Sequence, residues 1–139
     1  MIGDSIRFTI PGSPMGKGRV RFTKGGFCFT PETTMNYENL VKVTCIEKCE
    51  QRQPNYAGQV AVDITAFYPI PSSYTKKKQE QIRDGARPVK KPDLDNIAKI
   101  ILDALNHVAW QDDKQVVCMV LTKKYAEVPC VSVGIHYLE

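Results

Sequence analysis

The 139-residue sequence lacks several features that identify particular classes of protein. Its five cysteines are odd in number and include no C-x-x-C pair, so neither a disulfide framework nor a structural zinc site is indicated. Its longest uninterrupted apolar run, VVCMVL, has six residues, whereas a membrane-spanning helix needs about 20. The N-terminal residues show no basic-then-apolar leader. These absences predict a reduced, soluble, cytoplasmic protein.

The composition predicts one compact domain. With 139 residues, of which 42% are apolar, the chain can bury a core, but it is short for two domains. We therefore expect residues 1–139 to form a single domain, without internal repeats or low-complexity segments. The formal net charge of +4 makes the protein mildly basic, which is compatible with a nucleic-acid partner without demonstrating one.

The first half of the chain alternates strand and helix signals. Alternating apolar residues predict strands at 5–10 and 60–68. Between them, a helix is predicted from Thr30, which can cap it, with Pro31 in its first turn.

The second half predicts two helices and then two strands. A short polar helix is expected from near Thr75, ending before Gly85. A strongly amphipathic helix is expected from residue 93 or 95 to near residue 108, and the two strands after it could form a hairpin turning at 127–129. The order of elements predicts an α/β or α+β fold, with helices packed on a mixed sheet.

A cation-rich segment, PGSPMGKGRVRFTKGG, follows the first predicted strand. Lys17, Arg19 and Arg21 are spaced by two, which places them on one face of an extended chain. Two interpretations stay open at this point: a solvated edge strand, or an arm that faces the phosphates of a nucleic acid.

The helix predicted after Pro92 has two chemically different sides. At about 100° per residue, one broad apolar face can pack on a sheet, formed by Ile97, Ile100, Ile101, Ala104, Leu105 and Val108. A polar column occupies roughly 80° of arc on another side, formed by Asp95, Lys99, Asp103 and Asn106. Asp93 precedes the helix, and the acidic pair Asp112 and Asp113 follows it in the turn WQDDKQ.

Carboxylates in this arrangement suit a hydrolytic magnesium site, because Mg²⁺ prefers oxygen ligands and leaves positions for water and phosphate. Asp93 and Asp95, with Asp112 or Asp113 from a turn that returns to the start of the helix, would supply such a cluster. Lys99, one turn along, could hold a phosphate or the nucleophile. The helix N-terminus would also favour an incoming phosphate.

Structural roles account for the same residues. Asp93 is a suitable N-cap, and the helix dipole favours Asp95 in the first turn. Lys99 and Asp103 form an ordinary i,i+4 pair, and adjacent aspartates are common in turns. On composition and spacing alone, catalysis and capping with solvation both stay open.

Two other acidic motifs fit less well. An EF-hand loop would need an oxygen ligand at Ile97 and a glycine at Ala98. A D-x-D nucleotide site of the glycosyltransferase kind normally follows a strand in a much longer chain, whereas here the motif opens a helix.

The stretch KKPDLDNIAKIILDALNHVAWQDDKQV, residues 90–116, closely resembles the signature of the RusA family, the crossover-junction (Holliday junction) endodeoxyribonucleases of bacteria and their phages. That signature runs D-x-D-N-x-x-K, then D-A-L, then a D-D pair before a strand, and each part is present here in order. The resemblance extends upstream to SSYTKKKQEQ and RPVKKPD, and more weakly to PGSPMGKGRVRFT and FTPETTMNYENLV. It therefore covers nearly the whole chain.

The resemblance implies specific roles. Asp93 and Asp95 would be metal-binding catalytic carboxylates and Lys99 a catalytic lysine. Asp113 matches the third essential, metal-binding carboxylate, and Asp112 is an adjacent auxiliary candidate. The implied cofactor is Mg²⁺, with Mn²⁺ as a substitute. The implied fold is a small RusA-like α/β homodimer in which each subunit contributes one active site, and two sites related by a twofold axis suit a four-way junction.

The chain departs from the family pattern in places. His107 stands where relatives often carry Gly, and Pro92 stands where a basic or aromatic residue sometimes precedes the first Asp. We interpret His107 as a capping residue rather than a general base. The dinucleotide preferred for cleavage stays open.

We therefore expect a Mg²⁺-dependent, structure-selective endodeoxyribonuclease of bacterial or prophage origin, active in DNA recombination and repair. It would bind a four-way DNA junction and make paired symmetric nicks that leave 5′-phosphate and 3′-hydroxyl ends. The alternative is a junction-binding protein without cleavage activity. Phosphate contacts are expected from Lys17, Arg19, Arg21, Lys76, Lys77, Lys78, Lys90 and Lys91.

Overall fold

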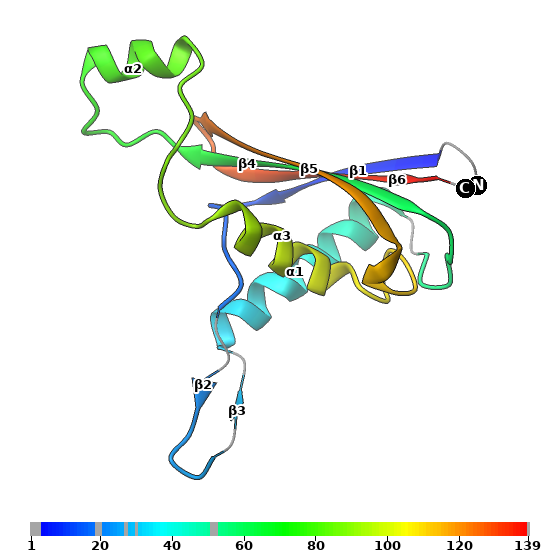
Figure 1. The fold of residues 1–139 in the computed structure, drawn as a ribbon. Helices are drawn as coiled ribbons and strands as arrows, with labels where there is room; N and C mark the ends of the chain where they lie inside the picture. Colours follow the sequence, from blue (N-terminus) through cyan, green and yellow to red (C-terminus); the bar gives the residue numbers. More distant parts are fainter. Residues whose placement is uncertain (1–3, 19–20, 27, 30, 51–52, 139) are drawn as a thin grey trace.

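The computed structural model describes residues 4–18, 21–26, 28–29, 31–50 and 53–138 (Figure 1). The helices are α1 (Glu32–Cys49), α2 (Lys76–Arg83) and α3 (Leu94–Leu105), with a short 3-10 turn, η1 (Asp113–Gln115). The strands are β1 (Asp4–Pro11), β2 (Arg21–Phe22), β3 (Cys28–Phe29), β4 (Val60–Pro69), β5 (Val116–Ala126) and β6 (Cys130–Tyr137).

The main sheet is four-stranded and mixed, in the order β1-β6-β4-β5. β4 runs parallel to β5, whereas β6 is antiparallel to both β1 and β4. The expected mixed α+β fold is therefore confirmed. The expected hairpin at 127–129 is wrong, because β6 does not pair with β5 but lies on the far side of β4. The segment 127–129, which joins β5 to β6, therefore crosses the end of β4. β4 occupies an inner position of the sheet and is buried at every second residue.

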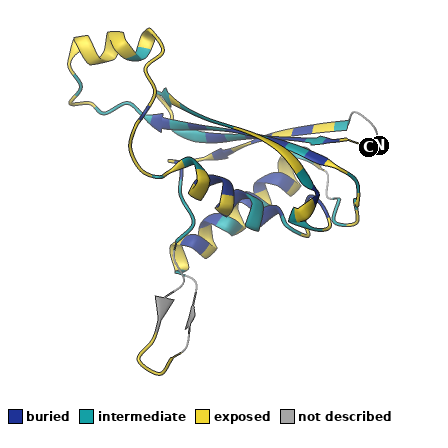
Figure 2. Ribbon diagram, viewed as in Figure 1, coloured by how far each residue is buried: buried dark blue, intermediate teal, exposed yellow. Residues whose placement is uncertain are grey.

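Helices α1 and α3 cover one face of the sheet (Figure 1), and the core lies between these two helices and the sheet. β4 and β1 turn alternate residues inward, as the sequence predicted. All six residues of the predicted apolar face of α3 are buried (Figure 2). Within the described ranges, no helix is both long and apolar enough to cross a membrane.

The helix boundaries differ slightly from those predicted. α1 begins at Glu32, with Pro31 at its N-cap rather than in its first turn, and Thr30 lies outside the described residues. α3 ends at Leu105 rather than near Val108, because the backbone leaves the helical region at Asn106, with a ψ of 130°, and His107 then adopts a φ of 64°. This turn still buries Val108.

Two parts of the chain project from this body (Figure 1). α2 stands beyond the end of β4 and buries none of its residues. Thr75 caps it by accepting from the Lys78 amide at 3.3 Å, and Gly85 follows its end with a φ of 104°, as predicted. β2 and β3 form a small antiparallel arm that extends away from the N-terminal end of α1.

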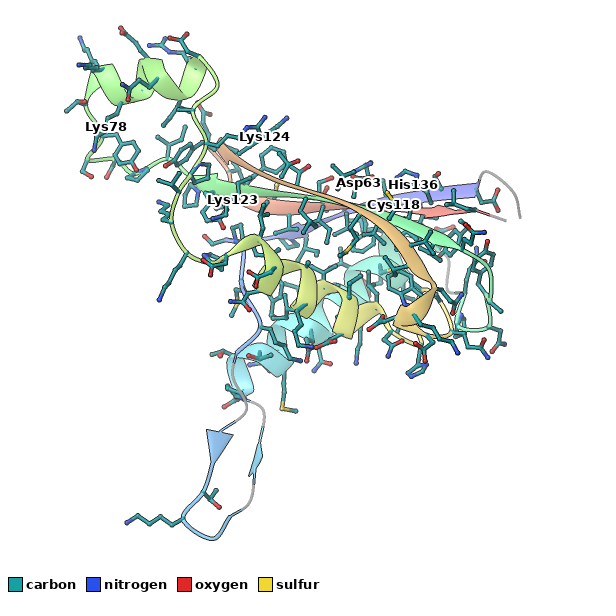
Figure 3. The ribbon with its side chains drawn as sticks, in the orientation of Figure 1. Asp63, Lys78, Cys118, Lys123, Lys124 and His136 are labelled. Carbon is teal, nitrogen blue, oxygen red and sulfur yellow. The ribbon has the colours of Figure 1, made fainter. Side chains whose placement is uncertain are left out.

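A polar cluster crosses three strands on the sheet face opposite the helices (Figure 3). The Asp63 carboxylate accepts from the Arg7 guanidinium at 2.9 Å and lies 2.7 Å from His136 Nε2. The other ring nitrogen of His136 lies 2.9 Å from the Ser5 hydroxyl. A Cβ at Gly134 would collide with the Asp63 carboxylate and the Arg7 guanidinium, so glycine at this position leaves room for that ion pair. Burial alone would raise the pKa of Asp63, but the bonds from His136 and Arg7 outweigh it and lower that pKa below 3.8.

We expect Asp63→Asn to lower the free energy of unfolding at neutral pH by about 1 kcal/mol, because the ion pair is partly exposed. A depressed pKa in the folded state contributes stability above the pKa of the unfolded chain, and this stability is lost as pH falls through the folded value. The difference from wild type should therefore shrink below about pH 4. Urea unfolding from pH 7 to pH 3 measures it. Asp84→Asn, the same change at an exposed site, is the control, and a pH-independent difference would contradict the prediction.

Candidate functional site

The N-terminal end of α3 presents two carboxylates to solvent. Asp93 takes the N-cap position with extended backbone angles, but its side chain caps no helix amide. Asp95 lies in the first turn, and both residues are exposed. Neither carboxylate takes part in a hydrogen bond or ion pair with the residues that the structure describes. Their oxygens are therefore available to a ligand, which the capping interpretation did not predict.

The segment before α3 is held against the sheet. Tyr68 on β4 donates its hydroxyl hydrogen to the carbonyl of Pro92. Lys123 on β5 donates to the carbonyl of Lys90 at 2.7 Å, and Arg87 donates to the carbonyl of Lys123 at 2.9 Å. These bonds place the start of α3 beside the C-terminal ends of the parallel strands β4 and β5.

A cleft of about 610 Å³ opens beside Asp93. One wall is the strap of residues 14–17, which packs so closely on α3 that a Cβ at Gly16 would lie 3.0 Å from Cβ of Asn96. The strap is also fixed by a bond of 3.0 Å from the Lys17 amide to the Asn96 carbonyl. The lining residues are Pro14, Met15, Gly16, Lys17, Lys91, Pro92, Asp93 and Asn96. The cleft thus combines a carboxylate, two cations and apolar walls.

The polar column of α3 forms as the helical period predicted, and it includes a cation from elsewhere. Asp103 lies 3.5 Å from Lys99 on its own helix and 3.1 Å from Lys17 of the strap. Lys17 also contacts Glu38 of α1 at 2.8 Å. The side chain of Lys99 remains 62% exposed. Lys99 lies one helical turn after Asp95.

The predicted phosphate contact Lys17 therefore has two protein carboxylates as partners. Its side chain is only 19% exposed, and those of Glu38 and Asp103 are 16% and 30% exposed. Burial lowers the pKa of Lys17, but the hydrogen bonds to Glu38 and Asp103 outweigh it and raise that pKa. Sequence analysis missed this role of Glu38, since nothing local in the sequence links a residue of α1 to the strap.

Asp113 lies at the opposite end of α3 from Asp93 and Asp95. α3 has 12 residues, so its two ends are separated by about 17 Å. The expectation that the turn returns to the start of the helix is therefore wrong within one chain. Among the described residues, no three acidic, histidine or cysteine side chains are close enough to hold a metal ion.

The surroundings of Asp113 fix its position. Its carboxylate accepts from the indole of the fully buried Trp110 at 2.8 Å, and its amide donates to the side chain of Asn106 at 3.1 Å. Burial raises its pKa, with Asp103 and Asp112 adding to the effect and the Trp110 bond opposing it. Asp112 instead forms a capping box with Gln115 at the start of η1. Trp110 was not predicted as a positioning residue.

The other predicted cations differ in how much of them the structure describes. Lys76, Lys77 and Lys78 are exposed on α2, with the Lys78 ammonium 4.9 Å from the ring centre of Tyr74. Lys90 and Lys91 are exposed on the segment before α3. Arg19 lies outside the described residues, and so does the side chain of Arg21. Contact with DNA stays a prediction for all of these cations.

His107 does not join the carboxylates at the start of α3. It is exposed and lies in the turn that follows the helix, with its positive φ in the region that glycine adopts more readily. This positive φ explains why Gly would suit the position. The capping role of His107 stays a prediction.

Comparison with known proteins places the chain in a family. The family described as Endodeoxyribonuclease RusA matches residues 11–136. The chain belongs to the RusA family. It is also 35% identical over 137 residues to a Bacillus subtilis (strain 168) protein named "Uncharacterized protein YqaN", with 96% of each chain covered. RusA membership makes this protein a DNA nuclease of a family that acts on branched junctions in recombination.

We expect Lys17→Met to lower the free energy of unfolding by about 1–3 kcal/mol, because Glu38 and Asp103 would keep their positions without their shared cation. Lys24→Met, at an exposed residue, should change it by no more than about 0.5 kcal/mol. Urea unfolding of the three proteins measures both effects. Equal stability of wild type and Lys17→Met would show that the Lys17 ammonium contributes nothing to the fold and is free for DNA.

Proposed function

We propose that this RusA-family protein is a Mg²⁺-dependent endonuclease that resolves four-way DNA junctions by paired symmetric nicks. The observation that carries the proposal is the pair of exposed, unbonded carboxylates of Asp93 and Asp95 beside Lys99 and an open cleft. Two aspartates without hydrogen-bond partners at a helix start repel each other, and a bound cation relieves that repulsion. A capping role would leave their oxygens bonded to helix amides.

The donor set at this end of α3 fits Mg²⁺ in kind, although it is incomplete. Asp93 and Asp95 would hold the ion through carboxylate oxygens, the ligands that Mg²⁺ prefers, and Mn²⁺ would take the same ligands. When bound, the ion would lower the pKa of water and offset charge that develops on the phosphate. A third carboxylate, Asp113, lies too far away in the same chain to contribute.

The remaining groups at this end can receive and orient a phosphodiester. The amides of the first turn of α3 carry partial positive charge toward the cleft side of the helix start. Lys91 lines the cleft next to Asp93, and Lys99 presents an exposed ammonium one turn along. These cations would position the scissile phosphate and stabilise its negative charge.

Backbone contacts farther along the DNA would come from α2. This helix carries three consecutive exposed lysines and packs none of its residues into the core. Its surface is therefore free for phosphates, and binding should weaken steeply as salt rises. Recognition would rest on the shape of the junction more than on base contacts.

The separated carboxylates suggest how a homodimer would work. Because Asp113 lies about one helix length from Asp95, each complete set of three would combine Asp93 and Asp95 of one copy with Asp113 of the other. A twofold axis then creates two equivalent sites, one for each strand to be nicked.

Junction cleavage tests the activity directly. Incubated with Mg²⁺, wild type should nick two opposed strands of a synthetic four-way junction and leave a linear duplex of the same sequence intact. Asp95→Asn should slow nicking at least about 100-fold, because it removes a charged group at the reacting phosphate, while junction affinity persists. Denaturing gels and gel-shift titrations measure cleavage and binding.

The control is Asp84→Asn, the same change at the end of α2, which should cleave like wild type. Cleavage that survives in Asp95→Asn would remove this residue from the site. Equal cleavage of linear duplex would refute junction selectivity. Tight junction binding by a wild-type protein that never cleaves would instead establish the binding-only alternative.

Mixed dimers test the shared site. A dimer of one Asp95→Asn copy with one Asp113→Asn copy, purified through two different affinity tags, should keep one intact site and make single nicks. Sites built within one chain would leave this dimer inactive. A wild-type copy paired with the Asp95→Asn/Asp113→Asn double variant reverses the outcomes: shared sites give no cleavage, whereas unshared sites give single nicks.

A further inference from the structure

A small cleft of about 270 Å³ lies between the end of α2 and the end of β5. Figure 3 shows Lys124 at the end of the sheet from which α2 projects. The cleft is smaller than the roughly 300–1,000 Å³ of most ligand sites, so it suits a single flat ring system. Its lining residues are Ile82, Gly85, Ala86, Arg87, Lys124 and Tyr125.

Tyr125 supplies an aromatic wall whose orientation is fixed. Its ring packs edge-to-face against Tyr74, with ring centres 6.2 Å apart, and the two hydroxyl oxygens lie 3.3 Å from each other. The Lys90 ammonium lies 5.8 Å from the centre of the Tyr125 ring. All three residues remain at least partly exposed to solvent. An exposed aromatic ring in a basic surrounding is a platform on which unpaired nucleobases stack.

The cations of the cleft are available to a ligand. Arg87 donates to the Lys123 carbonyl at 2.9 Å, which anchors its guanidinium beside β5. Within the described residues, neither Arg87 nor Lys124 has a carboxylate partner, and no acidic residue lines the cleft. Both residues are exposed. Their N–H groups can therefore reach a phosphate or the acceptor atoms on the edge of a base.

A neighbouring cleft of about 480 Å³ has different chemistry. It shares Ile82 with the smaller cleft, but the acidic Glu127 lines it and no aromatic residue does so among those that the structure describes. It also contains an exposed arginine, Arg83. Because a carboxylate repels the DNA backbone, the cleft at Tyr125 is the better nucleotide site, and Arg83 provides a matched control for Arg87.

We propose that the cleft at Tyr125, named here the base cleft, holds one unstacked nucleobase of the DNA junction. The base stacks on the Tyr125 ring and turns its polar edge to Arg87, while Lys124 contacts a phosphate of the same strand. Ile82 and Ala86 close the cleft around the apolar part of the base. Unstacking costs least where pairing or stacking is already interrupted, as at the exchange point of a four-way junction.

The base cleft deepens the proposed function and rests on it for the identity of the DNA. It lies between the exposed lysines of α2 and the segment that leads to Asp93. Lys123 links the two regions, because its carbonyl accepts from Arg87 and its ammonium donates to the Lys90 carbonyl at 2.7 Å. A base held here fixes the register of its strand relative to the carboxylates of α3. The base cleft thus helps to set which nucleotide is cut.

Junctions that lack single bases test the base cleft. In a series of synthetic four-way junctions, each nucleotide around the exchange point is made abasic in turn, and gel-shift titrations without Mg²⁺ measure the affinity. At one position of the series, wild type should bind at least about fivefold more weakly than it binds the intact junction, because a stacked base is missing. Tyr125→Leu should bind these two junctions equally. Tyr125→Phe keeps the ring without its hydroxyl and should retain the difference.

The two arginines beside the end of α2 give matched variants. Arg83→Met and Arg87→Met each remove one exposed positive charge. Arg83→Met should weaken binding to every junction by the same factor, whereas Arg87→Met should also reduce the difference between intact and abasic junctions. Circular dichroism checks that each variant folds. If Tyr125→Leu does not fold, the comparison of Arg87→Met with Arg83→Met decides.

Each outcome supports or overturns the base cleft. Wild-type affinity that is the same for every abasic junction overturns it. A difference that persists in Tyr125→Leu or Arg87→Met, or that disappears in Tyr125→Phe or Arg83→Met, also overturns it. Failure of the proposed function is distinguishable, because binding is measured without Mg²⁺. A protein whose affinity depends on one base through Tyr125 but that cuts no junction keeps the base cleft and removes the activity.

Discussion

The burial of one face of α3 against the sheet is the constraint on which the rest of the molecule depends. Ile97, Ile100, Ile101, Ala104 and Leu105 are at most 1% exposed, so the helix can neither rotate nor slide without opening the core. With its rotation fixed, the polar column of α3 must face outward. With its position fixed, its two ends must meet different parts of the sheet: the ends of β4 and β5 on one side, and the turn that starts β5 on the other.

Much of this was predictable because it depends on local periodicity. The faces of α3 follow from 3.6 residues per turn, the inward residues of β1 and β4 from alternation, and the limits of α2 from Thr75 and Gly85. The RusA signature in residues 90–116 identified the family for the same reason, since its residues are close in sequence.

The errors concern relations between distant segments. The order of β4, β5 and β6 depends on which strand is most buried, and two consecutive strands with a short link look like a hairpin in any sequence. The pairing of Lys17 with Glu38 and Asp103 joins three separate segments and leaves no local pattern. The position of Asp113 could have been anticipated, because the length of the predicted helix already separates it from Asp95 by more than a carboxylate can reach.

α2 differs from the other helices in what its sequence must satisfy. Because it buries none of its residues, the core places almost no demand on which side chains it carries, beyond the ability to form a helix. Substitutions there can therefore alter charge without loss of the fold. Selection acting on the basic residues of α2 would accordingly reflect what this helix touches, and homologues that act on differently shaped DNA could diverge here first while α3 stays constant.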